Sequence, residues 1–68
     1  MNRPLICLTL SKTTISEDLE LINRYRNYID IVELRADYLN EDELLSIRRF
    51  PELAQIPTIL TIRRKNDG

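Results

Sequence analysis

One glutamate and two arginines lie at the ends of apolar segments, and they are the residues best suited to binding a ligand. Glu33 and Arg35 lie two residues apart in the segment IVELR, so they would share one face of a β-strand. Arg63 ends the later segment TILTIR, and Thr9 lies near the end of the early segment LICLTL. Guanidinium groups bind carboxylates and hydroxyl-rich ligands with fixed geometry. Together these four side chains predict a binding site for a small polyhydroxylated acid.

The same side chains also allow a purely structural interpretation. Glu33 could form an internal salt-bridge cluster with Arg35 and Arg63 and bind no ligand, and the spacing alone favours neither alternative. Asp37 could cap the segment that follows or orient the Arg35 guanidinium, and we expect a cap. Cys7 is more typical of a small buried hydrophobic residue than of a nucleophile, because no base accompanies it.

Three predicted strands and two predicted helices must position these residues. Short apolar segments predict strands at residues 5–10, 31–35 and 58–62. Thr14 and Glu17 have the spacing of a capping box and predict the start of the first helix. Apolar residues three and four positions apart form one face of that helix, and we expect Asp18 on its polar face.

A second, shorter helix is predicted between the last two strands. Asn40 and Glu43 repeat the capping-box spacing, and Leu44 and Ile47 continue the apolar pattern. Pro51 limits this helix, and the residues from Phe50 to Pro57 predict a loop.

The order β-α-β-α-β predicts an α/β fold with parallel strands. Alternation along the strands gives one wholly apolar face, as expected beneath helices, and one face that becomes polar toward the strands' C-terminal ends. Ligands bind at that edge in barrels and open sheets. Three strands leave two unpaired edges and an uncovered polar face, and a closed barrel of about 250 residues would solve both problems. We therefore predict that residues 1–68 are the N-terminal fragment of a single (β/α)8 TIM barrel domain.

Composition excludes several classes of site. The chain has no histidine, one cysteine, and a single glycine at its last residue, Gly68, so metal sites with histidine, Gly-rich phosphate loops and internal disulfides are not expected. Ten basic and 11 acidic residues give a net charge of -1, which argues against a nucleic-acid partner. No apolar run is long enough to span a membrane. A free thiol without an export signal predicts a cytoplasmic location.

The sequence resembles the type I 3-dehydroquinate dehydratase family of the shikimate pathway of aromatic amino acid biosynthesis. The segments ICLTL, DIVELRADYL and ILTIRRKNDG carry the resemblance, in matching order and spacing. It covers essentially the whole chain but only about the first quarter of a family member. The resemblance implies a lyase with a (β/α)8 barrel. It further implies dehydration of 3-dehydroquinate to 3-dehydroshikimate through a Schiff base, with no metal or cofactor.

Carried over residue by residue, the resemblance implies that Glu33, Arg35 and Arg63 bind substrate, with Thr9 in the same pocket and Asp37 in support. The family's Schiff-base lysine and partner histidine come from later strands. This chain has no histidine and no lysine in a predicted strand, so we expect the isolated chain to be inactive. Its unpaired strand edges lead us to expect a homo-oligomer.

Two other functions are compatible with the same sequence. The chain could be a non-enzymatic βαβαβ module that folds by dimerisation or strand exchange. It could also belong to another barrel enzyme, acting on a sugar phosphate. The gene sequence beyond residue 68 would separate these hypotheses.

Overall fold

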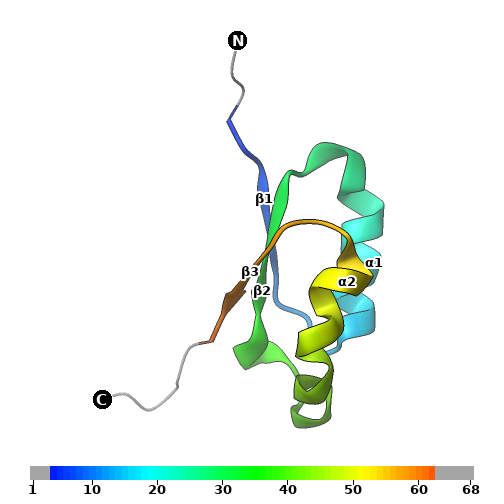
Figure 1. The fold of residues 1–68 in the computed structure, drawn as a ribbon, viewed down its shortest axis with the longest axis vertical. Coiled ribbons are helices and arrows are strands. Elements are labelled where there is room, and N and C mark those ends of the chain that lie inside the picture. Colours follow the sequence, from blue (N-terminus) through cyan, green and yellow to red (C-terminus); the bar gives the residue numbers. More distant parts are fainter. Residues whose placement is uncertain (1–3, 63–68) are drawn as a thin grey trace, which may run out of the picture.

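A computed structural model describes residues 4–62 and contains one parallel three-stranded sheet with two helices on one side (Figure 1). The strands β1 (Cys7–Leu10), β2 (Ile31–Arg35) and β3 (Thr58–Thr61) lie in the order β1-β2-β3. Helix α1 (Ile15–Tyr25) joins β1 to β2, and helix α2 (Phe50–Ala54) precedes β3. The predicted α/β fold with parallel strands is confirmed.

Helix α1 begins at the predicted capping box. The Thr14 hydroxyl oxygen accepts a hydrogen bond from the Glu17 backbone N–H at 3.2 Å, and the hydroxyl donates to Glu17 Oε1 at 3.0 Å. A second carboxylate reaches the same helix end, because Glu43 Oε1 accepts from the Ile15 N–H at 2.7 Å. The predicted capping box between Asn40 and Glu43 is therefore wrong: the Asn40 side chain caps nothing, and Glu43 caps α1 instead.

Helix α2 occupies a segment that the sequence predicted to be a loop. A 3-10 helix (Glu41–Arg49) runs directly into α2, so Pro51 does not end the helical segment. Proline is tolerated here because it lies in the first turn of α2, where its missing N–H is not needed. The helix ends at Gln55, which has the left-handed φ of 54°, and the Arg26 guanidinium donates to the Ala54 carbonyl at 2.9 Å.

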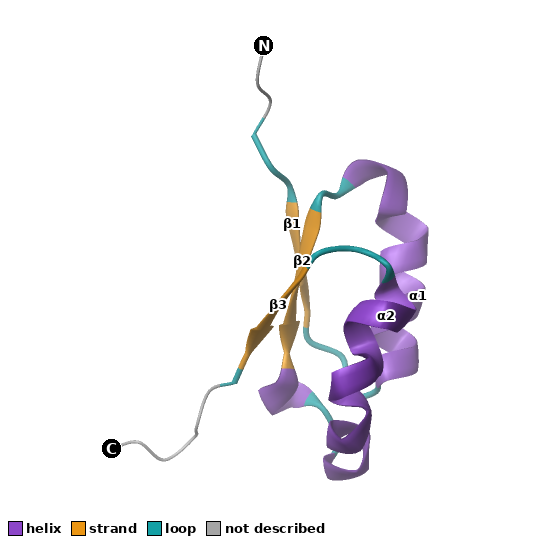
Figure 2. Cartoon of the chain, in the orientation of Figure 1, coloured by secondary structure: helices purple, strands orange, loops and turns teal. Residues whose placement is uncertain are grey.

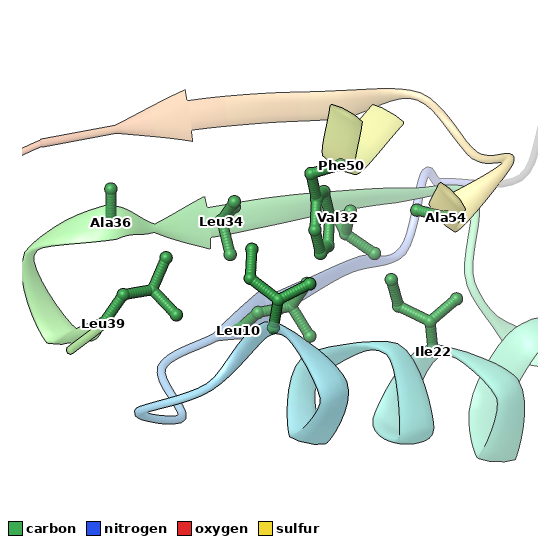
Figure 3. Close-up of a cluster of buried hydrophobic side chains, with 9 residues drawn as sticks. Leu10, Ile22, Val32, Leu34, Ala36, Leu39, Phe50 and Ala54 are labelled. Carbon is green, nitrogen blue, oxygen red and sulfur yellow. The ribbon is translucent and has the colours of Figure 1, made fainter. Parts of the chain in front are cut away.

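The hydrophobic core lies between the sheet and the two helices (Figure 3). Strand alternation holds as predicted for Leu10, Val32 and Leu34, which point toward the helices and are fully buried, whereas Leu60 of β3 is 48% exposed. Phe50 and Ile22 close the core from the helical side. Because these contacts hold the helices on one face, the other face of the sheet is left for the candidate site. No helix within residues 4–62 is long and apolar enough to cross a membrane.

Asp18 belongs to this buried side of α1, contrary to its predicted place on the polar face. It lies three residues after Ile15 and four before Ile22, both buried, so helical spacing carries it into the same stripe. Its side chain is 0% exposed. Oδ1 accepts from the Lys12 backbone N–H at 3.2 Å, while Oδ2 has no hydrogen-bond partner within residues 4–62. Desolvation, assisted by the Glu17 charge, raises the pKa of Asp18 to about 6.

Candidate functional site

The sheet face opposite the helices carries the predicted polar side chains. Both helices lie on one side of the sheet, and no helix or strand of residues 4–62 covers the other side (Figure 2). Strand register places Thr9 directly opposite Glu33, and Arg35 directly opposite Thr61. Since the strands are parallel, all four residues lie toward the same C-terminal edge of the sheet. This edge is the one at which the sequence predicted a ligand.

Glu33 is held between the two neighbouring strands by hydroxyl groups. The Thr61 hydroxyl donates to Glu33 Oε2 at 2.8 Å, and the Thr9 hydroxyl donates to Oε1 at 3.3 Å. Within residues 4–62, Glu33 forms no ion pair with Arg35. The described part of the chain therefore lacks the Glu33–Arg35 salt bridge of the structural alternative. Each carboxylate oxygen keeps lone pairs for a further donor.

The Arg35 side chain points toward Asp37, two residues later, and its guanidinium forms a bidentate ion pair with the Asp37 carboxylate. Nε donates to Oδ1 at 3.1 Å, and Nη2 donates to Oδ2 at 2.9 Å. The guanidinium also lies 4.9 Å from the ring centre of Tyr38, a cation–π distance. The hydrogen bonds that the guanidinium donates to Asp37 raise the pKa of Arg35 above its ordinary value, desolvation opposes the rise, and the charges of Asp37 and Glu33 add to it. Arg35 is therefore a fixed, permanently charged group with only 18% of its side chain exposed.

Asp37 orients Arg35 rather than capping the next segment, so the expected cap is wrong. The 3-10 turn Ala36–Tyr38 begins without any side-chain cap, and both Asp37 oxygens face the guanidinium. Cys7 is also corrected, because it is exposed on the uncovered face and not buried. Arg63 lies outside the described residues.

Thr61 is the site residue that the sequence analysis missed. Its segment carries the Thr-x-Arg motif, and alternation places it on the same sheet face as Glu33. Both signals place Thr61 on this face, but neither indicates that its hydroxyl binds Glu33, because that contact depends on the pairing of β3 with β2. Tyr38 was likewise not assigned to the site, although it stacks on Arg35.

The uncovered face presents both a carboxylate acceptor, Glu33, and a guanidinium donor, Arg35. Within residues 4–62, Arg35 bonds through Nε and Nη2 only, so its Nη1 group makes no hydrogen bond there. The described part of the chain contains no enclosed pocket and no group of three acidic, cysteine or histidine residues suited to a metal. The arrangement suits binding of a ligand that carries both hydroxyl and carboxylate groups.

Comparisons with known proteins agree on one family. The model of the family described as type I 3-dehydroquinase matches residues 6–68. A 3-dehydroquinate dehydratase of Methanococcus maripaludis is 34% identical over 64 residues, which cover 94% of this chain and 28% of the relative. A 3-dehydroquinate dehydratase of Coxiella burnetii is 32% identical over 68 residues, covering 100% of this chain and 29% of the relative. The chain thus spans less than a third of these relatives. No solved structure is significantly similar to it.

Proposed function

Because the chain belongs to the type I 3-dehydroquinase family, we propose that it supplies the substrate-binding, N-terminal part of a 3-dehydroquinate dehydratase. The reaction removes water from 3-dehydroquinate and yields 3-dehydroshikimate. One observation carries the proposal: Glu33, held by two hydroxyls, and Arg35, held by Asp37, stand on one uncovered sheet face. The substrate bears a carboxylate and several hydroxyls, the groups that such a pair binds.

The proposed surrounding fold is a (β/α)8 barrel. Strands in the unbroken order β1-β2-β3 with both helices on one side match one arc of a barrel, where helices lie outside and ligand-binding groups lie at the strand ends. In a doubly wound sheet the strand order would instead reverse and helices would cover both faces. A barrel would also enclose the polar face that residues 4–62 leave open.

Each proposed binding residue has a distinct role. Glu33 accepts a hydrogen bond from a substrate hydroxyl, and Thr9 extends the same polar row. Arg35 and Arg63 donate to the carboxylate or to neighbouring hydroxyls. A lysine that forms the Schiff base and a histidine that moves the proton would come from later strands, since this chain contains no histidine. A cytoplasmic location and a homo-oligomeric state stay predictions.

Turnover by a chimera tests the proposal. Residues 1–68 replace the matching segment of the Coxiella burnetii relative, and formation of the conjugated product is followed by its ultraviolet absorption. We expect the chimera to turn over 3-dehydroquinate and the isolated 68-residue chain to show none. An inactive chimera with a native circular dichroism spectrum, or turnover by the isolated chain, would contradict the proposal.

A further inference from the structure

We infer that Thr61 is a positioning residue, whose hydroxyl holds the Glu33 carboxylate apart from Arg35 so that this carboxylate and the Nη1 group of Arg35 both remain available to a ligand. The inference rests on the proposed function for the identity of that ligand. It concerns a residue whose side chain binds Glu33 directly, with an Oγ1–Oε2 distance of 2.8 Å.

Glu33 and Arg35 would be expected to pair with each other. They are oppositely charged, lie on one face of β2, and are separated by two strand positions, or about 7 Å between Cα atoms. Both side chains are long enough to close that distance. In the structure they do not pair: the guanidinium fork is bound to Asp37, and both carboxylate oxygens accept from threonines. The separation therefore requires groups that hold each charge in place.

Thr61 holds Glu33 more firmly than Thr9 does. Its hydrogen bond is 2.8 Å long, against 3.3 Å for Thr9, and Thr61 is partly buried whereas Thr9 is exposed. A hydroxyl bonded to a carboxylate is a charge-assisted donor, and a short bond is the stronger one. The branched Cβ of threonine restricts χ1, so the donor stays aimed at its acceptor.

The position of Thr61 in the register explains its effect on Arg35. Thr61 is the direct partner of Arg35 across β2 and β3, yet its hydroxyl bonds to Glu33. It therefore draws the carboxylate toward β3, while Asp37 draws the guanidinium along its own chain. Because the Thr61 hydroxyl is a neutral donor, it fixes the position of Glu33 without pairing the carboxylate with a positive charge. If the two charges paired, a ligand would have to break that ion pair before binding.

The test uses three variants at two positions of β3. Thr61→Val removes the hydroxyl at nearly constant shape, and Thr61→Ser keeps it. Thr58→Val is the matched control, because the Thr58 hydroxyl donates to the Ile56 carbonyl at 3.0 Å and does not contact Glu33. In the chimera, we expect Thr61→Val to lower kcat/KM about tenfold, mainly through a higher KM. Thr61→Ser should keep kcat/KM near the value of the parent chimera. Thr58→Val should change kcat/KM by less than about twofold.

A measurement on the 68-residue chain itself separates this inference from the proposed function. In NMR spectra of Thr61→Val, we expect new cross-peaks between the Glu33 and Arg35 side chains, absent from the parent and from Thr58→Val. Unchanged cross-peaks, or equal kcat/KM losses for the two valine variants, would overturn the role of Thr61. An inactive parent chimera would refute the dehydratase proposal. The cross-peaks would still show whether Thr61 keeps the Glu33 side chain away from Arg35.

Discussion

Asp18 should make the folded chain more stable in mild acid than at neutral pH. The folded state raises the pKa of this carboxyl from 3.8 to about 6, first through desolvation and then through the neighbouring Glu17 charge. The folded chain thus binds the proton more tightly than the unfolded chain does. The resulting stabilisation is complete below about pH 4 and is lost as the pH rises through 6. At 1.36 kcal/mol for each pH unit, the loss reaches at most about 3 kcal/mol, because relaxation around the charge reduces it.

Comparison with Asp18→Asn isolates this contribution from every other carboxylate. Asparagine keeps an oxygen to accept from the Lys12 N–H but cannot ionise. We expect urea unfolding, followed by circular dichroism, to give similar free energies of unfolding for both proteins at pH 4. At pH 7 the asparagine variant should be more stable by about 1 to 3 kcal/mol. Parallel pH profiles, or a parent chain that gains stability relative to the variant above pH 6, would refute the reasoning.

Two further predictions concern helix ends. Glu43→Ala should lower the free energy of unfolding by about 1 to 2 kcal/mol, because it leaves the Ile15 N–H without its acceptor. The control Glu20→Ala, on the exposed side of α1, should change the free energy of unfolding by less than about 0.5 kcal/mol. Equal losses of stability for the two variants would contradict the capping role of Glu43. Gln55→Gly should raise the urea midpoint, with a gain of about 1 kcal/mol, since Gln55 has a φ of 54° that glycine adopts without strain. A lower midpoint would show that the left-handed turn is not the end of α2.

The strands and the start of the first helix were predictable because neighbouring residues carry their signals. Residues 31–35 alternate between faces as expected, and Thr14 caps α1 through contacts with Glu17, only three residues away. Thr9, Glu33 and Arg35 share the predicted face for the same reason. Their assignment needed strand parity and parallel pairing, both of which are visible in sequence.

The errors have two physical origins. Asp18 was assigned by its polarity, although its spacing from Ile15 and Ile22 places it on the buried stripe of α1. Glu43 was matched to Asn40 because they are close in sequence, but its partner is a backbone N–H 28 residues away. Tertiary contacts of that kind leave no local signal. For Asp18, helical spacing predicts burial better than the polarity of the side chain does.

The placement of Glu33 and Arg35 on one face of the sheet was predicted more accurately than their hydrogen bonding. Sequence placed Glu33 and Arg35 together but could not decide whether they pair. The structure shows each charge bound to a different neighbour, Thr61 and Asp37, through side-chain hydrogen bonds. The choice of hydrogen-bond partner for each charged group depends on distances of a few tenths of an ångström, and the spacing of residues along a strand does not determine these distances.

The effect of Glu33→Gln on kcat/KM tests the central claim most directly. In the chimera that carries residues 1–68, we expect Glu33→Gln to lower kcat/KM for 3-dehydroquinate by about 10- to 100-fold, the usual loss for a hydrogen bond to a charged group. Glu20→Gln, an exposed glutamate on α1, serves as the control and should leave the value within about twofold. Equal kcat/KM values for Glu33→Gln and Glu20→Gln would contradict a substrate-binding role for the uncovered face of the sheet.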